Sequence, residues 1–369
     1  MAESSVRNQY FPTSVSAPGE TLRELLEERG ISQADLAERT GRPRKTINEI
    51  LQGKTAITPE TALQLELVLG VPARFWTARE ARYREFLARR AEEERLEALG
   101  EWVRQFPVRE MMKRGWIADV RGVSEKARAL LEFFGVASPE QWLVIQGRQA
   151  VAFRMSTAFE ARAAALATWL RMGERAAERR PCGEYDELRF RAALHDARDL
   201  TRTGPETFQP RLEEVCAQAG VAVVFVPELP GCRTHGATKW LNPRRALLQL
   251  SLRHKTEDQL WFSFFHEAAH ILLHRKRTIF LEGVNGLQDE EEAQADRFAS
   301  DFLIPPEHFP ALACRDTYSL AAIKAFAHQV GVSPGIVVGR LQHEKLIPYT
   351  HHNQLKMRLE WAGPQTAAV

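Results

Sequence analysis

Two histidines and a glutamate in the sequence His266-Glu267-Ala268-Ala269-His270 could bind and use a metal ion. On a helix, residues four apart lie on one face, so both histidines can reach the same small cation. Glu267 would be placed to accept a proton from a water molecule on that cation. Aromatic and aliphatic residues flank the motif, and polar groups in such surroundings stay unsatisfied unless something binds them. The spacing therefore predicts the centre of a zinc-dependent hydrolase.

An acidic segment further along the chain offers a third ligand. Glu292 and Asp296 are one helical turn apart, on a helix whose apolar residues predict a buried stripe. Glu292 would complete a set of two histidines and one carboxylate, as in catalytic zinc sites. Asp296 would accept the second ring N–H of a ligating histidine and fix its tautomer. The choice of Glu292 over Glu290 and Glu291 rests on its spacing from Asp296.

The alternative interpretation is that these polar residues only decorate solvated helix faces. HExxH sequences occur by chance, and the acidic run could be plain surface charge. The apolar neighbours of the motif leave little solvated face for it to occupy. We expect His274, one turn beyond His270, to lie outside the ligand set.

The composition is that of a globular chain of 369 residues, long enough for two or three domains. The 50 lysines and arginines nearly cancel the 48 acidic residues, so any nucleic-acid-binding surface must be local. Four scattered cysteines lack the paired spacing of a zinc finger and favour reduced thiols. The absence of an apolar signal segment, and of any apolar run near 18 residues, predicts a cytoplasmic protein that does not engage a membrane.

After a polar, flexible arm over residues 1–19, four short helices are predicted. Ser32 is the expected N-cap of the second, and Thr58-Pro59-Glu60 is expected to open the fourth. Short helices joined by tight turns describe a helix-turn-helix domain, which we place at residues 20–88. Glycines are expected to end the four helices: Gly30, Gly41, Gly53 and Gly70. Four side chains of the last helix are expected to face inward: Leu63, Leu65, Val68 and Leu69.

The predicted third helix, residues 43–51, carries side chains that could read DNA. Arg44, Lys45 and Asn48 share an exposed face, and arginine can read guanine and asparagine adenine in the major groove. Residues around this helix are placed for phosphate contacts. The alternative is a small helical bundle with ordinary surface charges. The whole expected DNA-binding set is Gln33, Arg42, Arg44, Lys45, Thr46, Asn48 and Lys54.

Residues 89–189 are predicted to form a helical middle region, with a loop from Arg175 to Arg180. Strand patterns over residues 221–226, 236–240 and 246–251 predict a small sheet directly before the HEAAH helix. An edge of that sheet could hold an extended peptide by backbone pairing. Two helices, 320–330 and 336–343, are expected to close a domain over residues 190–361. Residues 362–369 are expected to be a disordered tail.

Two parts of the chain show family resemblances. Residues 18 to about 85 resemble an XRE-type helix-turn-helix of the HigA antitoxin kind, through Gly30–Gln33, Ile47–Leu51 and Phe75-Trp76. Residues 190 to about 345 resemble the ImmA/IrrE metallopeptidase family, through Trp261–His274 and Glu292–Ala299. The second resemblance implies an α+β, zincin-like domain that cleaves a partner repressor. It also implies zinc bound by His266, His270 and Glu292, with Glu267 as base.

The expected fold class is therefore mainly α with a small β-sheet: an all-α helix-turn-helix domain, a helical middle region and the α+β domain. The first functional hypothesis is a bacterial transcriptional regulator that binds a double-stranded DNA operator as a homodimer. Its Zn²⁺-dependent peptidase domain would hydrolyse a peptide bond in a partner protein, such as a repressor or a toxin. The second is a HigA-like antitoxin or autorepressor whose metallopeptidase-like domain is a sensor or scaffold without catalysis. An intact Glu267 favours the enzyme. No histidine that would assist the transition state is evident from the sequence, and His235 and His254 are candidates only through their closeness in sequence to the predicted sheet and helix.

Overall fold

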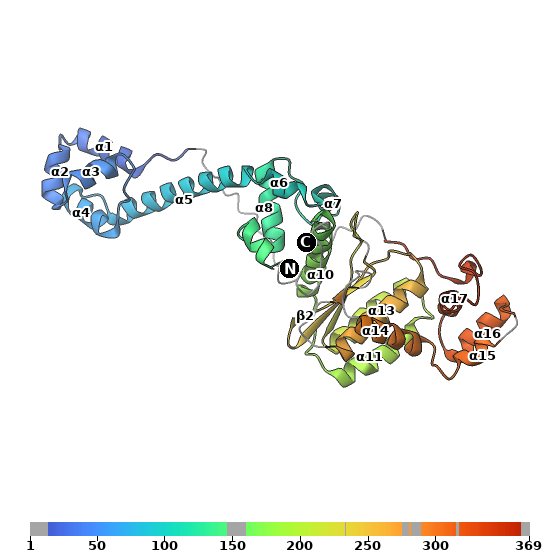
Figure 1. The fold of residues 1–369 in the computed structure, drawn as a ribbon. Coiled ribbons are helices and arrows are strands. Elements are labelled where there is room, and N and C mark those ends of the chain that lie inside the picture. The colour runs from blue at the N-terminus through green and yellow to red at the C-terminus, as the bar shows by residue number, and fades with distance from the viewer. Residues whose placement is uncertain are drawn as a thin grey trace. The chain divides into compact units, whose positions relative to one another are not determined.

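The computed structural model describes residues 14–145, 160–232, 234–274, 280–281, 289–314 and 317–362. These residues form a mainly helical protein with one small sheet, which confirms the predicted fold class (Figure 1). The chain divides into two compact units, Met1–Ala98 and Leu99–Val369, which are described separately. Residues 1–13 of the expected arm, and the expected tail beyond residue 362, lie outside the described residues.

The first unit contains the predicted short helices and one long helix: α1 (Pro18–Glu28), α2 (Gln33–Thr40), α3 (Arg44–Leu51), α4 (Pro59–Leu69) and α5 (Ala73–Glu97). Ser32 is the N-cap of α2, as predicted, and Thr58 is the N-cap of α4. The Ser32 hydroxyl accepts from the Asp35 N–H, while the Asp35 side chain accepts from the Ser32 N–H, a capping box. The Thr58 side chain accepts from the Thr61 N–H. The helices pack around almost fully buried side chains that include Leu22, Leu36, Ile47, Leu65 and Trp76.

Three details of this unit differ from expectation. Pro18 and Gly19 belong to α1 and are buried. The backbone of α1 approaches α3 so closely here that a Cβ at Gly19 would lie 2.2 Å from the backbone oxygen of Ile50. Leu63 does not face inward, since it is 57% exposed. The inner face of α4 is formed by Ala62, Leu65 and Leu69. α5 runs unbroken to Glu97, past the expected domain end at residue 88, since no glycine or proline interrupts it.

The second unit begins with α6 (Gly100–Arg104), α7 (Val108–Lys113), α8 (Val123–Phe134) and α10 (Glu160–Glu178). Trp102, Phe106, Phe134 and Trp142 form a cluster with ring centroids 5.0 to 6.3 Å apart, edge to face except for the tilted pair Phe106–Phe134. The predicted loop from Arg175 to Arg180 is wrong for residues 175–178, since α10 continues to Glu178.

Among the described residues, four strands form one sheet in the order β1-β3-β2-β4. They are β1 (Val221–Phe225), β2 (Gly236–Asn242), β3 (Arg245–Leu250) and β4 (Phe280–Leu281), and β3 is parallel to β1 and antiparallel to β2. Gln249 of β3 donates to the backbone oxygen of Trp169 on α10, whereas Thr238 of β2 contacts α13 (Glu257–Leu273). The sheet therefore lies between α10 and α13 (Figure 1).

The remaining helices surround α13: α11 (Glu187–Leu200), α12 (Pro205–Gln218), α14 (Asp289–Leu303), α15 (Phe309–Ala313), α16 (Leu320–Val330), α17 (Pro334–His343) and the 3₁₀ turn η2 (Asn353–Leu355). Arg198 of α11 donates to the backbone oxygens of Phe302, Leu303 and Val330. One guanidinium thus satisfies the last carbonyls of α14 and α16. No described helix is alone long and apolar enough to span a membrane; α16 and α17 meet that test only as a pair, bent by 108°.

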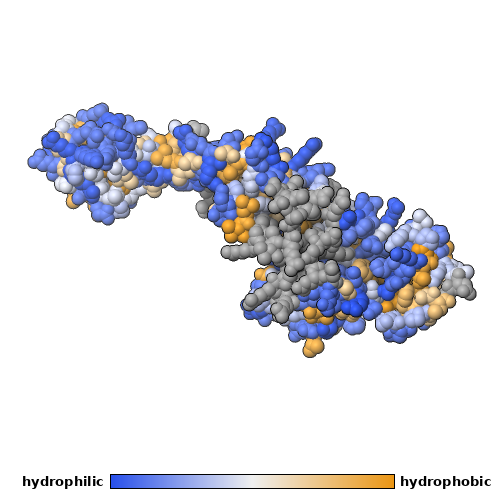
Figure 2. Space-filling model, viewed as in Figure 1, coloured by the Kyte–Doolittle hydropathy of each residue, from blue (hydrophilic) through white to orange (hydrophobic). Residues whose placement is uncertain are grey.

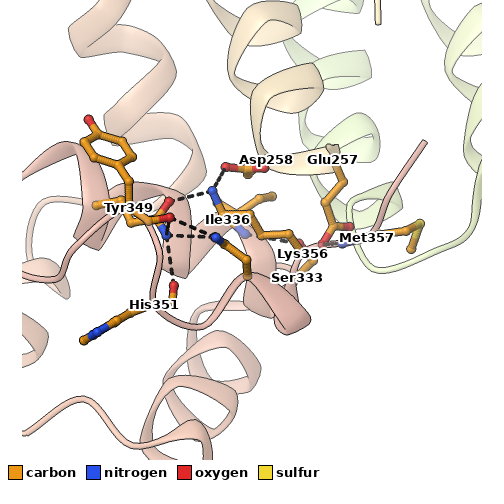
Figure 3. A network of polar contacts seen from close by, with 10 residues as sticks. Glu257, Asp258, Ser333, Ile336, Tyr349, His351, Lys356 and Met357 are labelled. Atoms are coloured by element: carbon orange, nitrogen blue, oxygen red, sulfur yellow. Dashed lines mark hydrogen bonds and ion pairs between the residues drawn. The ribbon is translucent and has the colours of Figure 1, made fainter. Parts of the chain in front are cut away.

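The first turn of α13 is held by the segment after η2 (Figure 3). Lys356 Nζ donates to Asp258 Oδ2 at 2.6 Å and to Gln342 Oε1 at 2.7 Å. The backbone N–H of Met357 donates to Glu257 Oε1 at 3.1 Å. Glu257 is 2% exposed and its pKa is raised, mainly by burial. Two acidic side chains at the start of α13 are therefore buried beside one ammonium group.

We predict that Lys356→Met lowers the free energy of unfolding of this unit by about 3–5 kcal/mol. The Lys356 and Asp258 side chains are 10% and 3% exposed, so the variant leaves a buried carboxylate without its cation. Urea denaturation, with hydrogen exchange of the α13 amides, measures the loss.

The control is Arg191→Met, which breaks an exposed ion pair with Glu187 and should change stability by less than about 0.5 kcal/mol. Adding Asp258→Asn to the Lys356→Met variant should recover part of the loss. Equal stability of Lys356→Met and the control would show that the ion pair does not hold α13.

Candidate metal centre

α13 and α14 bring the three predicted ligands together. His266 Nε2 lies 3.1 Å from His270 Nε2 and 3.2 Å from Glu292 Oε2. His270 Nε2 lies 3.6 Å from Glu292 Oε1. One ligand atom from each residue lies within 4.8 Å of the others. The four-residue spacing on α13 places the two imidazoles on one face, and α14 packs against that face.

The three residues fit a zinc ion. Ligand atoms about 2.0–2.2 Å from a tetrahedral zinc are about 3.3–3.5 Å from one another, close to the separations found here. Two imidazole nitrogens facing each other at 3.1 Å, next to a carboxylate, are also the donor set that a divalent cation would bind. Of the three neighbouring acidic side chains, Glu292 is the one that meets both histidines.

Two further residues contact His266 and His270 on the side of each ring that faces away from Glu292. The Nδ1 of His266 is 2.9 Å from Asp296 Oδ1, so the ring can donate this N–H and keep the Nε2 lone pair towards Glu292. The Nδ1 atoms of His270 and His274 are 2.8 Å apart. The structure thus places Asp296 and His274 where each can set the tautomer of one ligand.

Burial favours the neutral form of His270, the second predicted ligand. His270 is 1% exposed, and burial, together with the nearby charges of His266 and His274, lowers its pKa to about 2. A neutral imidazole is the form that binds a metal ion. The side of the centre formed by α14 is more open, since the side chains of Glu292 and Asp296 are 29% and 58% exposed.

Glu267 lies against the sheet and is fully buried. The Thr238 hydroxyl is 2.5 Å from Glu267 Oε2 and can donate to it. The sequence gives no sign of this contact, because Thr238 belongs to a strand 29 residues earlier. The structure also brings His235 and His254 together, with their Nε2 atoms 2.7 Å apart, at the strand end that begins with Gly236.

In the first unit, Gln33, Arg44, Lys45, Asn48 and Lys54 are exposed, and Thr46 is half-buried. The visible face of this unit is mostly hydrophilic (Figure 2). Arg42 is half-buried, and its Nε donates to Gln64 Oε1 at 2.7 Å. Gln52 is exposed one turn after Asn48 and donates to its side chain.

Comparisons with known proteins match two separate parts of the chain to two different families. Residues 22–76 match the model of the helix-turn-helix family, and residues 218–342 match that of the IrrE N-terminal-like domain, peptidase family M78. Over 59 residues the chain is 34% identical to the uncharacterized HTH-type transcriptional regulator YddM of Escherichia coli strain K12. This match covers 16% of the chain and 63% of YddM, so the chain spans less than two thirds of that relative.

Two solved structures are similar to a part of the chain. One is a candidate antidote protein of a plasmid maintenance system from Nostoc punctiforme, with 28% identity, a TM-score of 0.23, and coverage of 24% of this chain and 96% of that one. The other is an addiction module antidote protein of a HigA family from Coxiella burnetii, with 30% identity, a TM-score of 0.21, and coverage of 22% and 91%. The matched family models assign the chain a helix-turn-helix domain and an M78 peptidase-like domain.

Proposed function

We propose that this chain, which joins a helix-turn-helix domain to an IrrE N-terminal-like domain, is a DNA-binding transcriptional regulator with a zinc-dependent peptidase domain. The substrate would be a peptide bond in a partner protein, such as a repressor or a toxin. The observation that carries the peptidase proposal is the convergence of His266, His270 and Glu292, with Glu267 next to the first of them in the chain.

The chemistry divides among the residues of this centre. His266, His270 and Glu292 would hold the cation, and Asp296 would fix the His266 tautomer. A bound zinc ion supplies Lewis-acid polarisation of the scissile carbonyl and lowers the pKa of a coordinated water towards ~7. Glu267 would accept the proton of the attacking water and deliver it to the leaving amine. The buried flank of α13 would keep bulk water from the reacting atoms.

The DNA-binding proposal rests on the exposed face of α3. Arg44, Lys45 and Asn48 project from consecutive turns of one short helix whose opposite side, Ile47 and Leu51, is buried. Such a helix can enter the major groove, with flanking residues such as Gln33, Thr46 and Lys54 on phosphates. A second copy of the chain would read the second half of a symmetric operator.

We predict that Arg44→Ala and Asn48→Ala each weaken binding to the specific operator by about 1–3 kcal/mol and relax sequence preference at one position. Their side chains are exposed, and their removal deletes base contacts without opening the core. Competition binding against single-base operator variants measures both effects.

The matched control is Arg89→Ala, which removes the same charge from an exposed pair with Glu85 on α5. It should leave operator affinity within about twofold. If the α3 variants bind like this control, α3 is not the reading surface.

A second candidate function is an antitoxin or autorepressor in which the metal centre is a sensor or scaffold. Its support is the complete burial of Glu267, since a peptide bond must reach this carboxylate to be cleaved. Zinc analysis of the purified protein, and operator binding with and without zinc, separate the two functions. Operator affinity that follows zinc, with every partner protein intact, favours the sensor; cleavage of one partner favours the peptidase.

A further inference from the structure

Two residues of β2 lie against Glu267 from the sheet. Thr238 is 1% exposed, and its hydroxyl is 2.5 Å from Glu267 Oε2 and 3.1 Å from the Glu267 backbone oxygen. Gly236 leaves room for the Glu267 side chain, since a Cβ at position 236 would lie 2.6 Å from Glu267 Cγ and 2.8 Å from Glu267 Oε1. Residues two apart on a strand face the same way, so one strand supplies both features.

We propose that Thr238 and Gly236 are positioning residues that hold the Glu267 carboxylate as the base of the proposed peptidase reaction. A buried carboxylate needs a donor, and the Thr238 hydroxyl supplies one. A glutamate side chain has several rotatable bonds, and fixing one oxygen reduces the number of orientations that the carboxylate can adopt. This inference rests on the proposed function, because a base has a role only where a water is activated.

The same contact keeps Glu267 out of the ligand set. A carboxylate near a divalent cation is itself a good ligand, and a coordinated glutamate could no longer accept the proton of the water. In the structure His266, His270 and Glu292 form the group of ligand atoms, while Glu267 is bonded to the strand. Thr238 therefore acts through Glu267 and contributes to catalysis without touching the cation.

Three variants separate this role from a packing role. Thr238→Val keeps the branched shape and removes the hydroxyl; Thr238→Ser keeps the hydroxyl and removes a methyl group. Gly236→Ala adds the Cβ that would displace the carboxylate. The control is Thr168→Val, which removes another buried threonine hydroxyl, bonded to the Ala164 backbone oxygen on α10.

For cleavage of the partner protein by the full-length chain, we expect Thr238→Val to lower kcat about 10- to 100-fold and to change KM less than twofold. Gly236→Ala should lower kcat at least as much, because it moves the carboxylate itself. Thr238→Ser should restore kcat to within about threefold of wild type, and Thr168→Val should not change it. Zinc content should stay the same in all four variants. Failure of Thr238→Ser to restore kcat would overturn the proposal.

Binding of acetohydroxamate to the zinc-loaded protein gives a readout that does not need cleavage. A hydroxamate binds the metal and shares a proton with a neighbouring carboxylate, so it reports where Glu267 lies. Calorimetry should show about tenfold weaker binding for Thr238→Val and for Glu267→Gln, with no further loss in the double variant. Additive losses would overturn the proposal, because Thr238 would then act independently of Glu267.

The two measurements distinguish the inference from the function on which it rests. If acetohydroxamate shows the expected non-additive pattern but wild type cleaves no partner, the peptidase proposal fails and the positioning contact stands. If wild type cleaves its partner and Thr238→Val cleaves it equally fast, the positioning proposal fails and the peptidase stands.

Discussion

Replacement of Glu267 by Gln is expected to abolish cleavage of the partner protein while the chain keeps its zinc. The amide has the same shape as the carboxylate but cannot accept a proton from water, and loss of a general base costs about 10²–10⁴-fold in rate. Zinc should remain, because the proposed ligand atoms belong to His266, His270 and Glu292. The measurement is a proteome comparison of cells with wild type and variant, followed by cleavage of the identified partner with purified protein.

Glu290→Gln provides the control for this experiment. Glu290 is an exposed residue at the start of α14, and its loss should leave both zinc and cleavage unchanged. A Glu267→Gln variant that keeps zinc and cleaves as fast as wild type would exclude Glu267 as the base. Intact partner proteins in both wild-type and variant cells would support the sensor function instead.

Local sequence signals were enough to predict the helix-turn-helix unit and the convergence of His266, His270 and Glu292. Ser32, Thr58, Gly41 and Gly70 act within one helical turn, and the structure shows their caps. His266 and His270 are likewise one turn apart, so their common face follows from helix geometry alone. Leu63 shows the limit of this reasoning: apolar residues on α4 are too dense for one face, and small Ala62 is buried in its place.

The contacts that support the site could not be predicted in this way. Thr238 and Glu267 are 29 residues apart and meet only because β2 faces α13. Lys356 and Asp258 are 98 residues apart, and no spacing rule links a lysine after η2 to the first turn of α13. Such pairs depend on strand order and helix packing, which a single sequence leaves open. Residues that bind a ligand directly are therefore easier to predict than residues that position them.

A graded loss of zinc affinity is expected along the acidic side of the centre. The free energy of zinc binding is roughly 10–16 kcal/mol and is shared among three protein ligands. Glu292→Gln should remove on the order of a third of it, which weakens the Kd for zinc about 10²- to 10⁴-fold. Asp296→Asn keeps every ligand and disturbs only the His266 tautomer, so about a 10- to 100-fold loss is expected. Competition with a chromophoric chelator at fixed pH measures all variants on one scale.

The neighbouring acids decide whether Glu292 is the third ligand. Glu290→Gln and Glu291→Gln carry the same charge change on the same turn of α14, so general electrostatics would weaken zinc binding in all three variants alike. A specific ligand requires a large loss for Glu292→Gln and less than about a threefold change for the other two, because an exposed charge interacts weakly through solvent. If Glu291→Gln shows the largest loss, the ligand is one residue earlier and α14 presents a different face to the histidines. Since Asp296 is one turn beyond Glu292, that outcome would also remove its contact with His266, and the Asp296→Asn variant would then bind zinc like wild type.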